Sequence, residues 1–143
     1  MSGGGRFETA RGSVHAWQCD HMGHVNVRAY TELFEQACWQ LYNRIGITPS
    51  LLRGGKVNMA AVQQNISYRR ELLGGDVVVV RSAILDMRDK VLRFSHELVN
   101  CETDEVCADC EFTVVCLDAE ARRSRAFPPE VVARARQLAG APT

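Results

Sequence analysis

The hydrophobic positions that follow Asn26 recur with the period of a helix. Apolar side chains fall at the i, i+3, i+4, i+7 spacing, at Tyr30, Leu33, Phe34, Ala37, Cys38, Leu41, Tyr42 and Ile45. Asn26 is a favourable N-cap residue, and Gly46 is placed to end the helix. The pattern therefore predicts one long helix of roughly 18 residues, which spans about 27 Å.

From residue 59 onward the period drops to two, which is typical of β-strands. In the first of these segments one face is expected to hold Ala60, Val62, Gln64, Ile66 and Tyr68. Polar turns separate four predicted strands, at 59–68, 77–85, 92–98 and 106–116. A further strand is expected within Gly12–Trp17, a loop at 48–55 and a short terminal helix at 130–138. Since short links join the four strands, we expect an antiparallel sheet with the long helix against one face.

Length and composition set limits on this picture. A chain of 143 residues with 46% hydrophobic and 24% charged residues is typical of one globular domain. We expect a flexible N-terminal tail over 1–6, one domain over 7–139 and a C-terminal tail over 140–143. The 17 basic residues balance the 17 acidic ones, which argues against a nucleic-acid partner. The longest basic cluster, Arg122 and Arg123 with Arg125, is too small to indicate binding to an anionic membrane.

The six cysteines bear on the compartment. An even number in a short chain can indicate a disulfide framework, but a chain of this length can bury a core without such cross-links. The N-terminus does not resemble a signal peptide, and the longest apolar run, Val77–Val80, is too short to span a bilayer. We therefore expect a reduced, cytoplasmic protein whose cysteines are mostly small core residues.

The stretch directly before the long helix carries the most informative chemistry. Asp20, His21, His24 and Asn26 lie within seven residues at the predicted helix N-terminus. Free N–H groups and a partial positive charge at such a terminus can polarise a carbonyl oxygen, and a nearby carboxylate can attack the carbon or activate water. Gly23 would let the backbone approach a bulky ligand. This arrangement is a candidate acyl-transfer site; the alternative is a loop in which Asp20 and Asn26 only cap the helix.

The same stretch resembles a known family. Asp20-His-Met-Gly-His-Val-Asn26, followed by Tyr30 and Leu33-Phe34-Glu35-Gln36-Ala37, is similar to the 4-hydroxybenzoyl-CoA thioesterase-like branch of the hotdog-fold superfamily. The resemblance continues through Tyr68-Arg69-Arg70-Glu71-Leu72 to Phe127-Pro128, and covers about 14–135. It implies an α+β hotdog fold, in which an antiparallel sheet wraps around one long central helix.

The resemblance also implies roles for individual residues. Asp20 occupies the position of the catalytic carboxylate, as nucleophile or as general base, and the backbone N–H of Val27 would hold the thioester carbonyl. His24 and Asn26 match motif positions that orient Asp20 or the water. Tyr30 and Gly23 are expected to contact the substrate.

Several other residues are weaker candidates. Arg88 and Lys90, in a predicted turn, are expected to bind the phosphates of coenzyme A, and Arg69 with Arg70 form a second basic pair. Glu35 is a second acidic candidate, for which a solvated or ion-paired role is the alternative. His96 lies on an apolar strand face, which indicates a core or interface histidine. The Cys107-x-x-Cys110 pair lacks a second ligand pair, so we expect no metal site.

Together these features predict an acyl-CoA thioesterase that needs no cofactor beyond the coenzyme A of its substrate. The resemblance implies a homodimer or homotetramer with the site at the subunit interface, and an exposed sheet edge gives a physical motive for pairing. Two alternatives stay open: a hotdog dehydratase, whose helix motif we do not find, and a non-catalytic module that binds acyl-CoA. The acyl group and the carrier, coenzyme A or an acyl carrier protein, are not specified by these residues.

Overall fold

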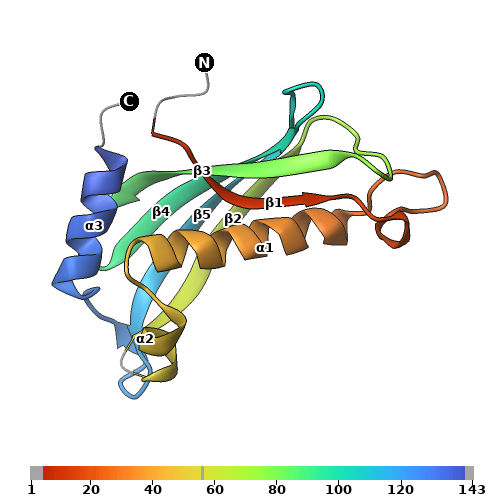
Figure 1. Ribbon diagram of the computed structural model, residues 1–143. Helices are drawn as coiled ribbons and strands as arrows, with labels where there is room; N and C mark the ends of the chain where they lie inside the picture. Colours follow the sequence, from red (N-terminus) through yellow and green to blue (C-terminus); the bar gives the residue numbers. More distant parts are fainter. Residues whose placement is uncertain (1–4, 56, 141–143) are drawn as a thin grey trace.

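The computed structural model describes residues 5–55 and 57–140. The predicted tail positions 1–4 and 141–143 lie outside these ranges. The helices are α1 (Val27–Arg44), α2 (Pro49–Arg53) and α3 (Pro129–Ala139), and a 3-10 turn spans Ala16–Gln18. The strands are β1 (Phe7–Ser13), β2 (Asn58–Tyr68), β3 (Val77–Met87), β4 (Val91–Asn100), β5 (Val106–Asp118) and β6 (Arg123–Ser124). They form one antiparallel sheet that curls around α1 (Figure 1), so the α+β hotdog architecture is confirmed.

The long helix forms where the hydrophobic period predicts it. The Asn26 side chain caps it by accepting a hydrogen bond from the Ala29 N–H at 3.2 Å. Gly46 follows its last turn with φ +94°, a left-handed conformation that favours glycine. One face of the helix is buried against the sheet, at Ala29, Tyr30, Phe34, Ala37, Cys38 and Leu41. This amphipathic face fixes the helix axis along the sheet, and its N-terminus lies beside the loop that carries Asp20.

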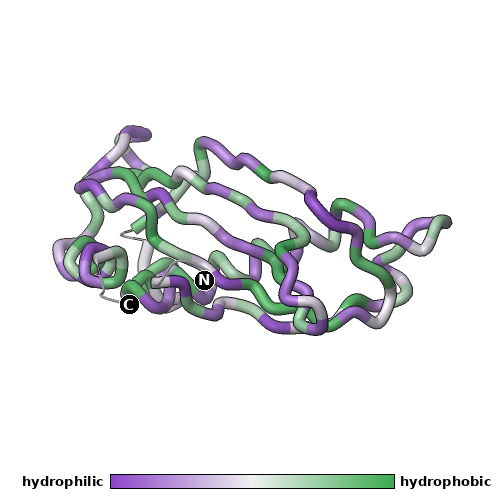
Figure 2. Tube along the Cα trace, turned by 90° about the horizontal axis from the view of Figure 1, so that it is seen from above, coloured by the Kyte–Doolittle hydropathy of each residue, from purple (hydrophilic) through white to green (hydrophobic). Residues whose placement is uncertain are grey.

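The strand order β1-β3-β4-β5-β2 differs in one respect from the expected succession of hairpins. β3, β4 and β5 are joined as hairpins, but β2 pairs with β5 and not with β3. The other edge of β3 is taken by β1, and the Val14 N–H donates to the Asp76 carbonyl at 2.8 Å where these strands begin and end. Residues 69–76 therefore cross one end of the sheet, next to the Asp20 loop. Apolar and polar residues alternate along the strands (Figure 2), as a sheet covered on one face requires.

Within β2 the predicted alternation is wrong because a bulge interrupts it. The register with β5 shifts between Ala61 and Gln63, which leaves Val62 as the extra residue. Met59 and Ala61 lie opposite buried residues of β5, and so does Ile66 after the shift. The inner face thus contains Met59 and Ala61 together with Gln64, Ile66 and Tyr68, and the strand cannot be read as a single period of two.

Three smaller elements also differ from the sequence prediction. β1 begins at Phe7, so the predicted segment Gly12–Trp17 overlaps only its last two residues. Charged residues interrupt this strand and hide its alternation in the sequence. The expected loop at 48–55 contains α2, which Thr48 caps by accepting from the Leu51 N–H at 3.2 Å. The two-residue strand β6 pairs with the end of β5 and is too short to leave a pattern.

A chain of hydrogen-bonded polar groups, the buried polar chain, crosses the core beneath α1. Thr9 Oγ1 donates to the Val80 carbonyl at 3.3 Å, so it accepts from Ser82 Oγ at 2.7 Å. The single hydroxyl proton of Ser82 is thereby used, and Ser82 Oγ accepts from His96 Nδ1 at 2.5 Å. His96 Nε2 is left unprotonated and accepts from Cys38 Sγ at 3.4 Å. His96 is fully buried, and this network satisfies both of its ring nitrogens.

Candidate functional site

The segment before α1 is a narrow loop closed by backbone hydrogen bonds. The Asn26 N–H donates to the Gln18 carbonyl at 2.8 Å, and the Asp20 N–H donates to the His24 carbonyl at 2.7 Å. Gly23 turns the loop with φ +80°, a conformation that residues with a Cβ rarely adopt. The loop therefore has a conformation defined by its own hydrogen bonds, and it leads directly into the first turn of α1.

The carboxylate of Asp20 is held by its own loop. Oδ1 accepts hydrogen bonds from the Met22 N–H at 2.8 Å and from the His24 N–H at 3.2 Å. The bond from Met22 is the largest cause that holds the pKa of Asp20 below its ordinary value, and the bond from His24 acts in the same direction. Within the described residues no hydrogen bond is made by Oδ2. Asp20 is exposed, so one oxygen of an ionised carboxylate is oriented by the loop and the other is open to solvent.

The N-terminus of α1 adjoins this loop. Val27 is the first residue of the helix, and helix geometry leaves its N–H without an intrahelical acceptor. A small hollow of about 100 Å³ lies beside this turn, lined by Trp17, Gln18, Asn26, Arg28, Ala29 and Glu32. Trp17 is 78% exposed and stacks on His15, with ring centroids 4.2 Å apart. Asp20 and Gly23 thus lie in the loop that leads into α1, while Asn26 and Val27 form the N-cap and the first residue of the helix.

His24 contacts the segment that crosses from β2 to β3. Its Nε2 lies 3.3 Å from Glu71 Oε2, and its backbone forms an isolated bridge with Leu73. Tyr30 is buried beside it, with its ring edge-on to Tyr68 at 5.1 Å between centroids. A second hollow of about 180 Å³ is lined by Tyr30, Tyr68, Arg69, Arg70 and Glu71. In the sequence, Glu71 belongs only to the stretch that carries the family resemblance, and no pattern assigns it a role.

Arg88 and Lys90 do not join this site within one chain. The Asp20 loop adjoins the start of β3, whereas Arg88 follows its last residue, and 11 strand residues extend about 36 Å. Arg88 is exposed and pairs with Asp86 at 3.1 Å. The predicted phosphate contacts therefore lie at the opposite end of the sheet from Asp20. Closer to the site, Arg69 pairs with Asp109, and Arg70 lies 3.1 Å from Glu105.

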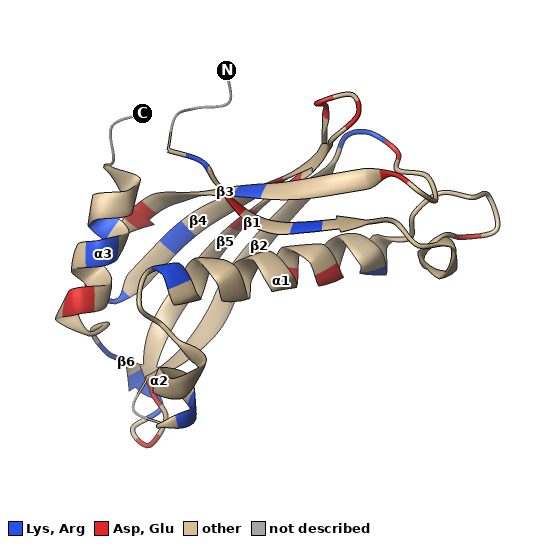
Figure 3. Ribbon diagram, viewed as in Figure 1, with Lys and Arg blue, Asp and Glu red and all other residues tan. Residues whose placement is uncertain are grey.

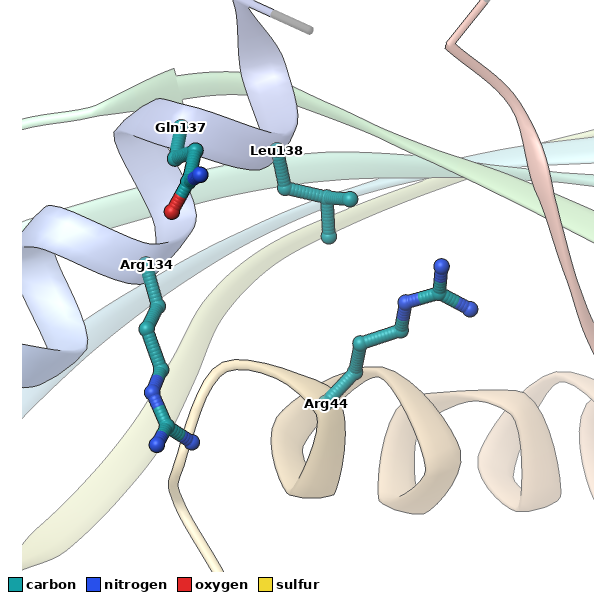
Figure 4. A pocket seen from close by; sticks show the side chains of 4 residues that line it. All are labelled: Arg44, Arg134, Gln137 and Leu138. Carbon is teal, nitrogen blue, oxygen red and sulfur yellow. The ribbon is translucent and has the colours of Figure 1, made fainter.

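Two hollows larger than the two described above lie at that opposite end. One of about 410 Å³ is lined by Asp89, Ala126, Phe127, Pro129, Val132, Ala133 and Arg136. Another of about 280 Å³ lies between the C-terminal ends of α1 and α3, lined by Arg44, Arg134, Gln137 and Leu138. Figure 4 shows the guanidinium groups of Arg44 and Arg134 apart from each other, on opposite sides of this hollow, with Leu138 above them. Because they point apart, they do not form a clamp for one anion.

The remaining candidates have structural surroundings. Glu35 lies on the exposed side of α1. His96 belongs to the buried polar chain, in agreement with its assignment to the core. Cys107 and Cys110 are buried in β5, and burial raises the pKa of both thiols. In the two described ranges, no three His, Cys, Asp or Glu side chains gather as metal ligands, and no helix is long and apolar enough to cross a membrane.

Comparisons with known proteins agree with the fold. The long-chain acyl-CoA thioesterase FadM of Escherichia coli K12 is 25% identical over 126 residues, which cover 87% of this chain and 94% of that protein. A Staphylococcus aureus protein solved in complex with CoA superposes with a TM-score of 0.86 at 20% identity, over 94% of this chain and 85% of that one. The 1,4-dihydroxy-2-naphthoyl-CoA thioesterase of Synechocystis superposes with a TM-score of 0.82 at 16% identity, over 93% and 97% of the two chains. These two structures show a shared fold.

The match to a family model covers the loop, the long helix and the strands β2 to β6. The model describes the thioesterase-like superfamily, and it matches residues 14–135. This range contains Asp20, the α1 N-terminus and every strand from β2 to β6. The chain belongs to the thioesterase-like superfamily.

Proposed function

We propose that this protein is an acyl-CoA thioesterase, which hydrolyses the thioester to a free acid and coenzyme A with Asp20 as the catalytic carboxylate. One observation carries the proposal: the loop amides of Met22 and His24 hold Oδ1 of Asp20 and leave Oδ2 open, in the loop that leads into α1. Membership of the superfamily and the similarity to a long-chain acyl-CoA thioesterase support it.

Two routes use this geometry. As a nucleophile, Oδ2 attacks the thioester carbon, the C–S bond breaks, coenzyme A leaves as a thiolate, and water then hydrolyses the mixed anhydride. As a general base, Oδ2 takes a proton from water while the water oxygen attacks the same carbon. In both routes the Val27 N–H stabilises the oxyanion and the C–S bond then breaks. The departing thiolate takes its proton from solvent in the first route and from the protonated Asp20 in the second. Neither route calls for a metal or an organic cofactor.

The substrate contacts follow from the same arrangement. Gly23 leaves space at the loop, and a Cβ built there would meet no atom within 4 Å. Tyr30 borders the hollow beside His24 and is proposed to contact the substrate. Arg88 and Lys90 lie at the far end of the sheet, so any contact they make with coenzyme A would be with a molecule bound at the site of a second copy of the chain.

The test is release of free thiol from a panel of acyl-CoA thioesters with aromatic, branched, charged, medium and long acyl groups. Hydrolysis predicts stoichiometric free thiol and free acid from at least one member of the panel. A dehydratase would change the acyl chain without releasing thiol. A binding module would retain acyl-CoA with no turnover. Either of these results would contradict the proposal.

We further propose that two copies pair through the β2 edges of their sheets. Residues 61–65 of β2 are exposed, and the strand contains no charged residue and no proline. Charged residues and prolines are what usually block pairing at a free sheet edge. The opposite edge, β1, carries charged residues (Figure 3): Glu8 and Arg11, whose side chains form an ion pair at 2.6 Å. Pairing at β2 extends the sheet next to Tyr68 and the hollow beside His24.

Charging the β2 edge is expected to separate the copies. Gln63→Lys with Asn65→Lys places like charges along both strands of a two-fold antiparallel pair and removes the dimer, because like charges at facing positions repel. Light scattering measures the mass. Ser13→Lys, at the end of β1, is the control and should stay dimeric. A wild-type chain that is monomeric at high concentration, or a double variant that stays dimeric, would contradict pairing at β2.

A further inference from the structure

We propose that Glu71 is a positioning residue of the candidate site, which fixes the imidazole of His24 and, through His24, the loop that carries Asp20. The inference rests on the proposed hydrolysis. Glu71 is separated from His24 by 47 positions, and neither composition nor periodicity assigns it a role. The crossing of residues 69–76 over one end of the sheet brings the two side chains together.

The backbone of His24 is fixed on two sides. On one side its carbonyl accepts from the Asp20 N–H at 2.7 Å, and its own N–H donates to Asp20 Oδ1 at 3.2 Å. On the other side it bridges Leu73, and the next residue, Val25, donates to the Leu72 carbonyl at 3.0 Å. A displacement of His24 would therefore shift its N–H, which donates a hydrogen bond to the Asp20 carboxylate.

The side chain of His24 has an acceptor at one ring nitrogen. Nε2 lies 3.3 Å from Glu71 Oε2, and an ionised carboxylate can only accept hydrogen bonds. In the neutral tautomer that suits this neighbour, the proton is on Nε2 and Nδ1 keeps a free lone pair. The His24 side chain is 37% exposed, so water can reach it. Nδ1 is thus available to accept a hydrogen bond from the water that attacks the thioester.

The Glu71 side chain is 71% exposed, and its place in the fold sets it between His24 and a hollow. Its neighbours in the chain are already paired, Arg69 with Asp109 and Arg70 with Glu105. No other ion pair of Glu71 exists within the described ranges. The side chain also lines the hollow of about 180 Å³ that contains Tyr30 and Tyr68. Glu71 therefore borders a candidate substrate hollow on one side and holds His24 on the other.

The test compares Glu71→Ala with Glu71→Gln, in the wild-type chain and in the His24→Ala chain. Glu71→Ala is expected to lower kcat for thiol release about fivefold with KM unchanged, which is near the upper limit for an exposed pair. Glu71→Gln should keep kcat within about twofold, since its amide oxygen can occupy the same place beside Nε2 and accept a hydrogen bond there. In the His24→Ala chain, Glu71→Ala should change kcat no further, as expected of two groups that act as one unit. Glu111→Ala removes an exposed carboxylate paired with Arg93, also at 3.3 Å, and is the matched control.

The possible failures are distinguishable. An equal fall in kcat in both backgrounds, or a rise in KM with unchanged kcat, would show that Glu71 acts through its charge on the substrate and would overturn the inference alone. Equal impairment of Glu71→Gln and Glu71→Ala would also overturn it. A wild-type chain that releases thiol from no acyl-CoA would overturn the proposed function together with this inference.

Discussion

Asp20→Asn is expected to lower kcat for thiol release from acyl-CoA by about 10² to 10⁴-fold. Asparagine keeps the size of the side chain, and its amide oxygen can still accept from the N–H groups of Met22 and His24. The loop should therefore keep its shape, while the free oxygen that attacks the carbonyl or takes a proton is replaced by an NH2 group. Steady-state kinetics with the best substrate of the panel measures the change.

Asp118 supplies a matched control for this variant. Its Oδ1 accepts from the Glu120 N–H at 3.0 Å and from the Ala121 N–H at 3.2 Å, the same kind of turn that Asp20 makes. Asp118→Asn should leave kcat unchanged, because this turn follows β5 and contributes nothing to the α1 N-terminus. Comparable kcat values for wild type and Asp20→Asn would show that Asp20 has no catalytic role, whatever the effect of the substitution on substrate binding.

Acid is expected to destabilise the fold through His96. Burial is the main cause that lowers the pKa of His96 to about 3 from an ordinary value of 6.5, and Arg6 adds to it. The folded chain thus keeps the imidazole neutral while the unfolded chain binds a proton below pH 6.5. The contribution of His96 to the free energy of unfolding is fully present above pH 6.5 and falls as the pH drops toward about 3. At about 1.4 kcal/mol per pH unit, the full loss is about 5 kcal/mol.

The measurement is urea unfolding of wild type and His96→Gln at pH 7.5 and pH 4.5. Glutamine can bond to Ser82 and Cys38 without titrating, so it isolates the imidazole. Between the two pH values the wild type should lose about 3 kcal/mol more stability than the variant. His21→Gln, at an exposed loop position, should follow the wild type. Equal losses for wild type and His96→Gln would mean that the buried imidazole does not couple folding to protons.

The features that local sequence determines were predictable. The α1 boundaries follow from a period of 3.6 and from the Asn26 cap, and the Asp20 loop is a neighbour of that helix in the chain. The inward position of His96 follows from strand alternation on β4. Each of these depends on residues within one or two turns or along one strand, where side-chain spacing and backbone geometry are directly linked.

The features that depend on distant pairing were not predictable. The link between β2 and β3 reads as a hairpin, but β1 competes for the edge of β3 and displaces β2 to the far side of β5. The same crossing places Glu71 beside His24 and separates Arg88 from Asp20. The bulge at Val62 has no signal in the residue types around it, because Ala61 and Gln63 suit either face.

If two copies pair at β2 as proposed, the contrast between the two outer strands limits how large the assembly can grow. A sheet whose two edge strands can both pair with further copies adds copies without limit and forms fibres. Here the edge strand β1 carries a glutamate and an arginine, while the edge strand β2 is uncharged. Two copies paired through β2 would therefore expose only their charged β1 edges. Addition of copies along the hydrogen-bonding direction of the sheet would then stop at two copies. Reversing one charge on β1 would leave that edge charged and would not restart the addition.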